Sequence, residues 1–70
     1  MASGNLRGIV GKNVAKFRKK FNITQVELAK KMGCSSNFIA LLETGNRAPS
    51  FDTLEKITRI LKVKAQKLFE

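Results

Sequence analysis

Helical periodicity limits the fold of this chain more than any other feature of its sequence. Near the N-terminus, apolar side chains recur at spacings of three or four residues: Leu6, Val10, Val14, Phe17 and Phe21. This spacing places them on one face of a helix, and the basic residues between them lie mostly off that face. The pattern predicts a basic amphipathic helix over residues 5–20, ended near Asn22, because asparagine tolerates the left-handed conformation of a helix end.

Polar residues and a glycine delimit a second helix. Thr24 and Glu27 have the spacing of a capping box, in which each side chain accepts a hydrogen bond from the backbone N–H of the other residue. The helix is expected over residues 25–32, and Gly33 is expected to end it in a left-handed conformation.

Serine residues open two more helices. Ser35 is expected to cap a helix over residues 36–43, and Ser50 a helix over residues 51–61. A last short helix is expected over residues 65–69, although no good capping residue precedes it. Because no segment shows the alternation of a strand, the sequence predicts an all-α fold, a compact bundle of about five short helices.

The periodicity also predicts which side chains of the later helices are buried. These are Val26, Leu28, Ala29, Met32, Ile39, Leu42, Phe51, Leu54, Ile57 and Leu61. A chain of this length buries only about 60% of the surface that its unfolded form exposes. Residues 1–70 are therefore expected to form one domain with one small core, in which residues 1–4 are disordered or derived from a tag.

Composition argues against catalysis and against metal binding. The chain has no histidine, which is the commonest general base and the commonest metal ligand. Its one cysteine, Cys34, can form neither an internal disulfide nor a structural zinc site. With no acid–base pair of plausible geometry in view, we expect no catalytic residue, no metal and no cofactor. Cys34 is expected to be a buried small apolar residue, with a redox sensor as the alternative.

The chain shows no sign of export or of membrane insertion. Its longest apolar run, residues 38–42, has five residues, far fewer than the roughly 20 that span a bilayer. The N-terminus has no apolar stretch typical of a signal peptide. Together with the single cysteine, these features predict a cytoplasmic protein without a membrane span.

Net charge indicates the kind of partner. Fourteen Lys and Arg against five Asp and Glu give a charge of +9, and the isoelectric point is about 10.4. A polyanion is therefore the expected partner, with nucleic acid as the first candidate. The second is an anionic membrane surface, bound through the basic first helix.

Two short helices joined through Gly33-Cys34-Ser35 form a helix-turn-helix arrangement. Residues 18–29 and 39–50 carry in order an Arg, Thr-Gln, Leu-Ala, then Ile, Glu-x-Gly and Pro-Ser, with Gly33 and the Ser35 cap between them. This ordered set, within residues 9–69, resembles the phage lambda repressor-like, or XRE-type, helix-turn-helix family. The resemblance implies a five-helix bundle that binds a double-stranded DNA operator and places its third helix in the major groove.

The resemblance also implies base contacts near the start of the 36–43 helix. Ser36 and Asn37 stand where the family reads bases, and an asparagine amide can bond adenine through two hydrogen bonds. Because Ser36 is shorter than the family's frequent glutamine, a phosphate or water-mediated contact is the alternative there. Leu41 lies about 200° around the helix from Ile39, so it is expected to face outward and to contact a thymine methyl group. An ordinary exposed leucine is the alternative.

Phosphate contacts are implied on both sides of that helix, by Gln25, Ser35, Thr44, Asn46 and Arg47. Gln25 begins a helix, where backbone N–H groups attract anions, and its amide is expected to meet a phosphate or to brace a side chain of the third helix. In the loop after residue 43, backbone N–H groups and Arg47 suit the same role. A solvated surface is the alternative for all of them, as it is for Lys12, Lys16, Lys19 and Lys20, which otherwise add non-specific attraction.

Two further roles are structural. The resemblance implies an ion pair between Arg18 and Glu43 that ties the first helix to the end of the third, although the two residues alone would be interpreted as solvated charges. Phe38 is expected to fold onto the second helix, with a contact at the groove edge as the alternative.

The expected biological role follows from these assignments. One such module buries roughly 600–1,000 Å² on DNA, which is too little for strong specificity, so a homodimer on two half-sites is expected. Its best candidate surface is the last helix, with Val63, Leu68 and Phe69. The protein is expected to be a transcriptional regulator acting as a repressor on the nucleoid of a bacterium or on phage DNA. The alternative on the same fold is an antitoxin that binds a toxin, or a module that bridges proteins of the transcription machinery.

Overall fold

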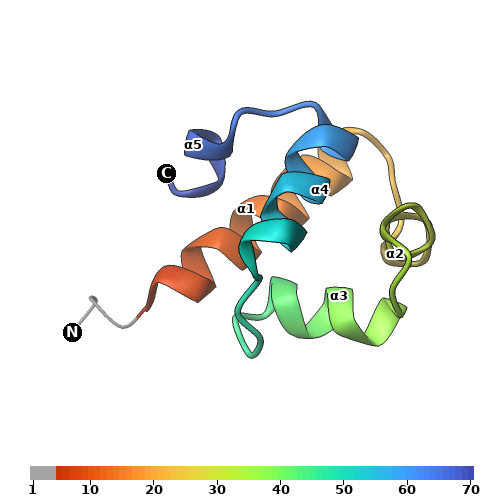
Figure 1. Ribbon diagram of the computed structural model, residues 1–70, viewed down its shortest axis with the longest axis horizontal. Helices are drawn as coiled ribbons and strands as arrows, with labels where there is room; N and C mark the ends of the chain where they lie inside the picture. The colour runs from red at the N-terminus through yellow and green to blue at the C-terminus, as the bar shows by residue number, and fades with distance from the viewer. Residues whose placement is uncertain (1–4) are drawn as a thin grey trace.

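The computed structural model describes residues 5–70, and these form five α-helices with no strand (Figure 1). The helices are α1 (Leu6–Lys20), α2 (Gln25–Met32), α3 (Ser36–Glu43), α4 (Phe51–Leu61) and α5 (Ala65–Leu68). The predicted all-α bundle is confirmed, with α1 starting one residue later and α5 ending one residue earlier than expected. The expectation for residues 1–4 lies outside the described residues.

The helix ends form as the sequence predicts. The Thr24 hydroxyl accepts from the Glu27 N–H at 3.0 Å, and the Glu27 carboxylate accepts from the Thr24 N–H at 2.8 Å, which completes the capping box. Gly33 ends α2 with a φ of 74°, and Asn22 follows α1 with a φ of 58°. Ser35 and Ser50 cap α3 and α4 through their hydroxyl groups.

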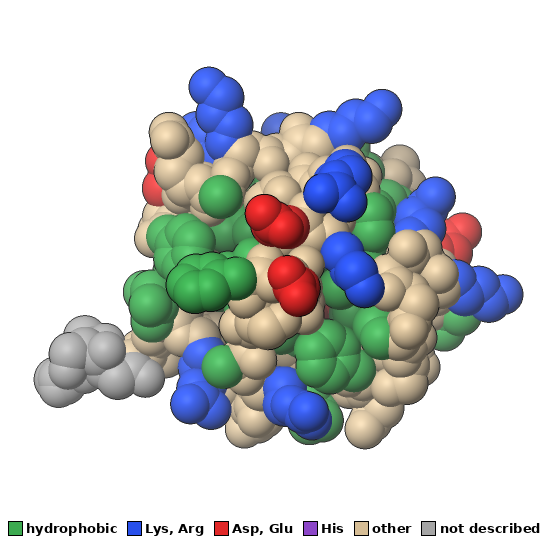
Figure 2. Space-filling view, viewed as in Figure 1, with side chains coloured by type: hydrophobic (Ala, Val, Ile, Leu, Met, Phe, Trp, Pro, Cys, Tyr) green, Lys and Arg blue, Asp and Glu red, His purple; other side chains and the backbone are tan. Residues whose placement is uncertain are grey.

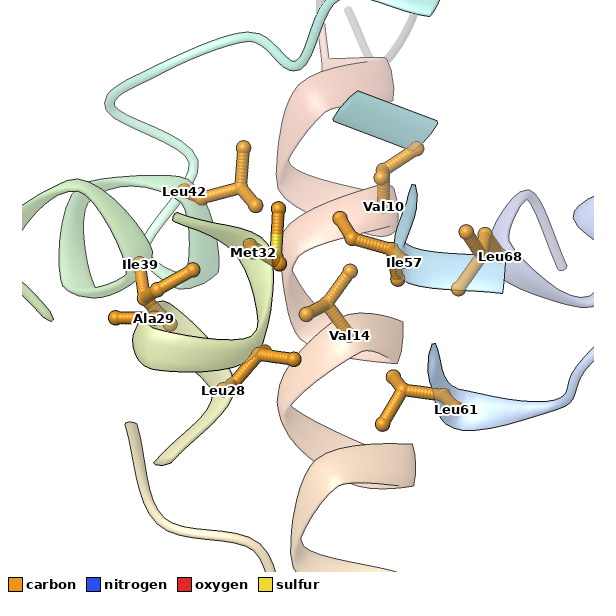
Figure 3. Close-up of a cluster of buried hydrophobic side chains, with 10 residues drawn as sticks. All are labelled: Val10, Val14, Leu28, Ala29, Met32, Ile39, Leu42, Ile57, Leu61 and Leu68. Atoms are coloured by element: carbon orange, nitrogen blue, oxygen red, sulfur yellow. The ribbon is translucent and has the colours of Figure 1, made fainter. Parts of the chain in front are cut away.

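The core lies where all five helices meet (Figure 3). Its ten buried side chains are Val10, Val14, Leu28, Ala29, Met32, Ile39, Leu42, Ile57, Leu61 and Leu68. Helix α1 packs against α3, α4 and α5, while α2 packs against α3 and α4. Burying each of the larger side chains contributes about 1.5–3 kcal/mol, so a short chain holds five helices together with few residues.

Several predicted core residues lie at the surface instead. Leu6 and Phe21, at the two ends of α1, are 54% and 46% exposed. Val26 is 52% exposed on the outer side of α2. Phe51, the first residue of α4, is 86% exposed, since the contact of α4 with the core begins further along the helix. Leu54 and Phe17 are partly buried against the core.

Leu68 corrects the prediction for the last helix. It was expected at a dimer surface, but its side chain is fully buried and its carbonyl accepts a hydrogen bond of 2.8 Å from the Asn13 amide of α1. Phe69 is 43% exposed and Val63 is partly buried against the core. Only Phe69 among the three therefore offers a large surface to a partner.

Glycine permits a close approach of α1 to the end of α3, which the periodicity of the sequence did not reveal. A Cβ atom on Gly11 would lie 2.1 Å from the carbonyl oxygen of Leu42. After α3 the chain turns at Gly45, with a φ of 80°, and a Cβ there would lie 3.0 Å from the Cα of Gly8. The position of α3 on α1 therefore depends on residues without side chains.

Candidate nucleic-acid interface

Helix α3 is held by its inner side and presents its outer side to solvent. Ile39 and Leu42 are fully buried, which orients the helix on α1 and α2. Ser36 and Asn37, in the first turn, are exposed, and within residues 5–70 neither side chain forms a hydrogen bond with the protein. Their donors and acceptors are free to bond an external group at the point where α3 begins.

Leu41 is less exposed than the sequence suggested. Its side chain is half-buried, so only part of it is open to an external group. The Asn46 N–H donates to the Leu41 carbonyl at 2.9 Å, and the Arg47 guanidinium lies 5.4 Å from the centre of the Phe38 ring. Phe38 packs against the core, which agrees with its expected packing role.

The loop after α3 uses most of its own polar groups. The backbone N–H groups of Thr44, Gly45 and Asn46 donate to carbonyls of α3, so they are not the phosphate donors that were expected. The Thr44 hydroxyl lies 3.1 Å from the carbonyl oxygens of both Ala40 and Leu41, and it accepts from the Asn46 amide at 2.9 Å. Because the C-terminus of a helix carries partial negative charge, anion attraction in this loop depends on exposed Arg47.

A buried network joins three helices beside this surface. Arg18 and Glu43 form the expected ion pair, with Nε to Oε2 at 2.6 Å and Nη2 to Oε1 at 3.1 Å, and both side chains are less than 10% exposed. Arg18 also donates to the Ile23 carbonyl at 2.8 Å, and the Gln25 amide donates to Glu43 Oε1 at 2.9 Å. The network fixes the start of α2 against the end of α3.

Gln25 therefore has one role assigned by geometry. Its amide braces Glu43, the last residue of α3, and one amide hydrogen stays available for another acceptor. The Glu27 N–H donates to the Thr24 hydroxyl. The N–H groups of Gln25 and Val26 lie at the start of α2, so no preceding turn of the helix supplies a carbonyl to which they could donate. The start of α2 is consequently a positively polarised helix end beside α3.

A model of the helix-turn-helix family matches residues 14–68 of this chain. The chain belongs to the lambda repressor-like (XRE-type) helix-turn-helix family. The family is one of DNA-binding transcriptional regulators. In this chain the helix-turn-helix is formed by α2 and α3, which are joined by the turn at Gly33.

Relatives and solved structures agree with this assignment. The chain is 41% identical over 56 residues to an uncharacterized HTH-type transcriptional regulator of Archaeoglobus fulgidus, covering 80% of this chain and 79% of the relative. It is 33% identical over 60 residues to YazB of Bacillus subtilis, another uncharacterized HTH-type regulator, and the match covers 86% of this chain and 87% of YazB. The biofilm regulator SinR, solved in complex with DNA, superimposes with a TM-score of 0.80 at 27% identity. The superposition covers 87% of this chain and 98% of the SinR chain.

A basic hollow that the sequence did not locate adjoins α3 in this helix-turn-helix protein. It has a volume of about 580 Å³ and lies between α1 and the end of α3, where Lys12, Lys16, Lys19 and Thr44 line it. From the sequence, these lysines are expected either to add non-specific attraction or to form a solvated face. The sequence signal was their recurrence at three- and four-residue spacings, which places them on one side of α1, but only the packing of α3 shows what that side adjoins.

Two absences complete the description of the site. Within residues 5–70, no three His, Cys, Asp or Glu side chains come together as a group that could hold a metal ion. Among the same residues, no helix is both long enough and apolar enough to cross a bilayer.

Proposed function

We propose that this helix-turn-helix protein reads a specific double-stranded DNA operator by placing the first turn of α3 in the major groove. The observation that carries the proposal is the pair of exposed side chains Ser36 and Asn37, free of bonds to the protein on a helix whose opposite side is rigidly packed. A major groove about 12 Å wide admits one helix in this way.

Each base contact has a chemical reason. The Asn37 amide offers a donor and an acceptor that match N7 and N6 of adenine. Ser36 is suited to a short or water-mediated contact. The exposed part of Leu41, on the same side of α3, supplies apolar area for a thymine methyl group.

Phosphates on either side of the groove would be held by residues that flank α3. On one side, the start of α2 supplies the backbone N–H of Gln25 and its second amide hydrogen. On the other, Arg47 supplies the charge and Asn46 an amide group, with Ser35 and Thr44 as weaker partners because their oxygens already accept hydrogen bonds. Lys12, Lys16 and Lys19 extend the attraction along α1.

The regulator would act as a repressor in the cytoplasm of a bacterium or on phage DNA. The five-helix bundle of residues 5–70 would repress by occupying its operator. Because one module buries roughly 600–1,000 Å² on DNA, two copies on adjacent half-sites are needed for strong specificity.

A protein-binding role on the same fold, as an antitoxin or a bridging module, is the second candidate. It is favoured by Phe51, an aromatic side chain that is 86% exposed outside the DNA-facing surface. In that case duplex binding would be weak and independent of Asn37.

Selection of binding sites from random duplexes at two salt concentrations tests the proposal. Wild-type protein should enrich one sequence, and Asn37→Ala should cost about 1–3 kcal/mol on it and relax the preference at one base pair. Gln66→Ala, an exposed amide on α5, is the matched control and should bind as wild type does. Equal weakening of Asn37→Ala on selected and random DNA would contradict base reading by this residue.

A further inference from the structure

A second basic hollow lies between the later part of α1 and the chain that connects α4 to α5. It has a volume of about 780 Å³. Figure 2 shows Lys and Arg side chains projecting from the upper edge of the molecule, along which the connection between α4 and α5 runs in Figure 1. The charged residues that line the hollow are five exposed lysines and one exposed glutamate: Lys16, Lys20, Lys62, Lys64, Lys67 and Glu70.

The five lysines form two rims whose spacing is determined by the fold. Two of them are one turn apart on α1, and the other three run from the end of α4 into α5. The Asn13 amide of α1 donates to the Leu68 carbonyl of α5 at 2.8 Å, and the Leu68 side chain is fully buried, so the two rims are held together. The Glu70 carboxylate lies 3.6 Å from Nζ of Lys67, and within residues 5–70 the other four lysines form no ion pair. The hollow therefore keeps an excess of positive charge.

The second basic hollow and α3 lie on opposite sides of α1. Gly11 marks the side of α1 that meets α3, because a Cβ atom there would overlap the carbonyl oxygen of Leu42. At about 100° per residue, Lys20 lies about 180° around α1 from Gly11, and Lys16 lies about 140° from it. In Figure 1, α3 accordingly lies at the bottom of the view and the connection between α4 and α5 at the top. A duplex bound by the outer side of α3 leaves this hollow open.

The lining of the hollow favours nucleic acid over an acidic protein as its occupant. Protein–protein interfaces are depleted of lysine and depend on aromatic or apolar anchors at their centre. The two apolar residues that line this hollow, Phe17 and Val63, are partly buried against the core and do not protrude as anchors. Protein–DNA interfaces are more polar and much more positively charged, as this hollow is.

A duplex suits the hollow better than a single strand does. Proteins that hold single strands stack the bases on exposed aromatic rings. The ring that lines this hollow, Phe17, packs against the core, and Nζ of Lys16 lies over it at 5.6 Å from the ring centre. A lysine ammonium is a point charge without a fixed bonding geometry, so two rows of lysines suit the phosphate backbone of a duplex of any sequence.

We propose that the second basic hollow holds the backbone of a second DNA duplex, so that one copy of the protein bridges two duplex segments. One segment is read by α3 and the other is held without regard to its sequence. The inference rests on the proposed function in one respect, that α3 occupies the first duplex. Because phosphate contacts alone hold the second duplex, it should dissociate at a lower salt concentration than the operator.

Capture of one duplex by another tests the bridge. Wild type is mixed with one equivalent of a labelled operator duplex that has one half-site, and is passed over beads that carry a random-sequence duplex. At low salt the beads should retain the label. The combined change of Lys62→Asn, Lys64→Gln and Lys67→Gln should lower the retained label by about tenfold or more. Asparagine is used at position 62 because the backbone there has a φ of 56°, a left-handed conformation that asparagine tolerates.

A matched variant controls for the loss of charge. Lys30→Gln, Lys31→Gln and Lys56→Gln remove the same charge from exposed lysines that do not line the second basic hollow, and this variant should retain the label as wild type does. The two triple variants should bind the operator duplex alone equally tightly, and thermal unfolding shows whether each keeps its fold. Equal retention of the label by the two variants, or no retention by wild type, overturns the bridge.

NMR separates this inference from the proposed function. Once one equivalent of operator has shifted the amide resonances of Ser36 and Asn37, added random duplex at low salt should shift those of Lys64 and Lys67. Resonances of the hollow that respond to poly-glutamate or to phosphatidylglycerol vesicles, and not to the duplex, overturn the inference and leave the proposed function standing. Shifts at the hollow with every duplex, in a protein whose α3 resonances never move, keep the hollow as a duplex site and overturn the proposed function.

Discussion

Arg47 shows how a single residue links the fold to the proposed contact with DNA. Its guanidinium lies over the Phe38 ring, 5.4 Å from the ring centre, so an otherwise mobile side chain is held beside α3. Since the loop N–H groups before it are bonded to α3, Arg47 is the only cation within residues 44–50 that can attract a phosphate.

Replacing Arg47 by alanine should weaken binding to all duplex sequences by a similar factor. The reason is that a phosphate contact carries no sequence information, and its loss should lower the slope of log K against log salt by about one unit. Binding isotherms at several salt concentrations measure both effects. Arg59→Ala is the control, because Arg59 lies in the last turn of α4, away from the loop that carries Arg47. A salt slope that is unchanged in Arg47→Ala would show that Arg47 does not contact a phosphate.

Glu27 links a single carboxylate to the stability of α2. The pKa of Glu27 is lowered, first because the backbone N–H of Thr24 donates to the carboxylate, and then through the Thr24 side chain and Lys31 and Lys30. A carboxylate whose pKa is lower in the folded state stabilises the fold above the unfolded pKa of about 4.3. That effect is lost as the pH falls through the folded pKa.

Comparison of wild type with Glu27→Gln isolates this effect. Glutamine still accepts the hydrogen bond of the capping box but does not titrate. The free energy of unfolding, measured by urea denaturation, should therefore fall more steeply with acid in wild type than in Glu27→Gln below about pH 4.3. Parallel pH profiles for the two proteins would show that the Glu27 carboxylate has the same pKa in both states.

At the scale of helices, the contact between α1 and α3 sets the orientation of the reading helix. Gly11 allows this contact, because a Cβ there would lie 2.1 Å from a backbone oxygen of α3. At Gly8, one turn earlier, the nearest atom to a Cβ is the end of the flexible Asn5 side chain.

The two glycines should respond oppositely to substitution by alanine. Gly8→Ala should stabilise the protein by about 0.5–1 kcal/mol, because alanine is the better helix former and Asn5 can move. Gly11→Ala should destabilise it by at least about 1–3 kcal/mol, because the backbone of α3 must shift. Thermal unfolding measures both, and a Gly11→Ala variant as stable as Gly8→Ala would contradict the close approach.

The Arg18–Glu43 ion pair joins the same two helices further along α1. Removing one partner, as in Arg18→Met, should cost about 3–5 kcal/mol because Glu43 is left as a buried charge without its cation. Replacing both, as in Arg18→Met with Glu43→Leu, should recover most of that loss. Urea unfolding of the single and double variants checks this, and a double variant less stable than either single one would show that the pair stabilises the fold by more than its desolvation costs.

At the scale of the whole molecule, sequence reasoning succeeded where a property is local. Neighbours within one turn determine the bounds of α2, α3 and α4, their N-terminal caps, and the left-handed residues Asn22 and Gly33. It failed where burial depends on distant segments: Phe51 has the spacing of a core residue, yet within residues 5–70 no other element covers it. Leu68 fits an exposed terminal helix by sequence, but α5 folds back onto α1 and buries it.

For the candidate site, as for the fold, sequence reasoning predicted the features that depend on local periodicity and missed those that depend on packing between segments. Exposure of Ser36 and Asn37 follows from the period of α3 once Ile39 and Leu42 are taken as buried. The engagement of the loop N–H groups by α3 could not be predicted, because it depends on how the chain turns at Gly45. The basic hollow between α1 and α3 could not be predicted from the sequence either, because it depends on how the two helices pack.

An NMR titration of the whole domain with its selected duplex tests the central claim most directly, namely that the outer side of α3 enters the groove. Backbone amide resonances of Ser36, Asn37 and Leu41 should shift most, followed by those of Gln25 and Arg47, while the resonances around Phe69 should change little at a single half-site. Large shifts confined to α4 and α5, with the resonances of α3 unchanged at saturation, would contradict the account.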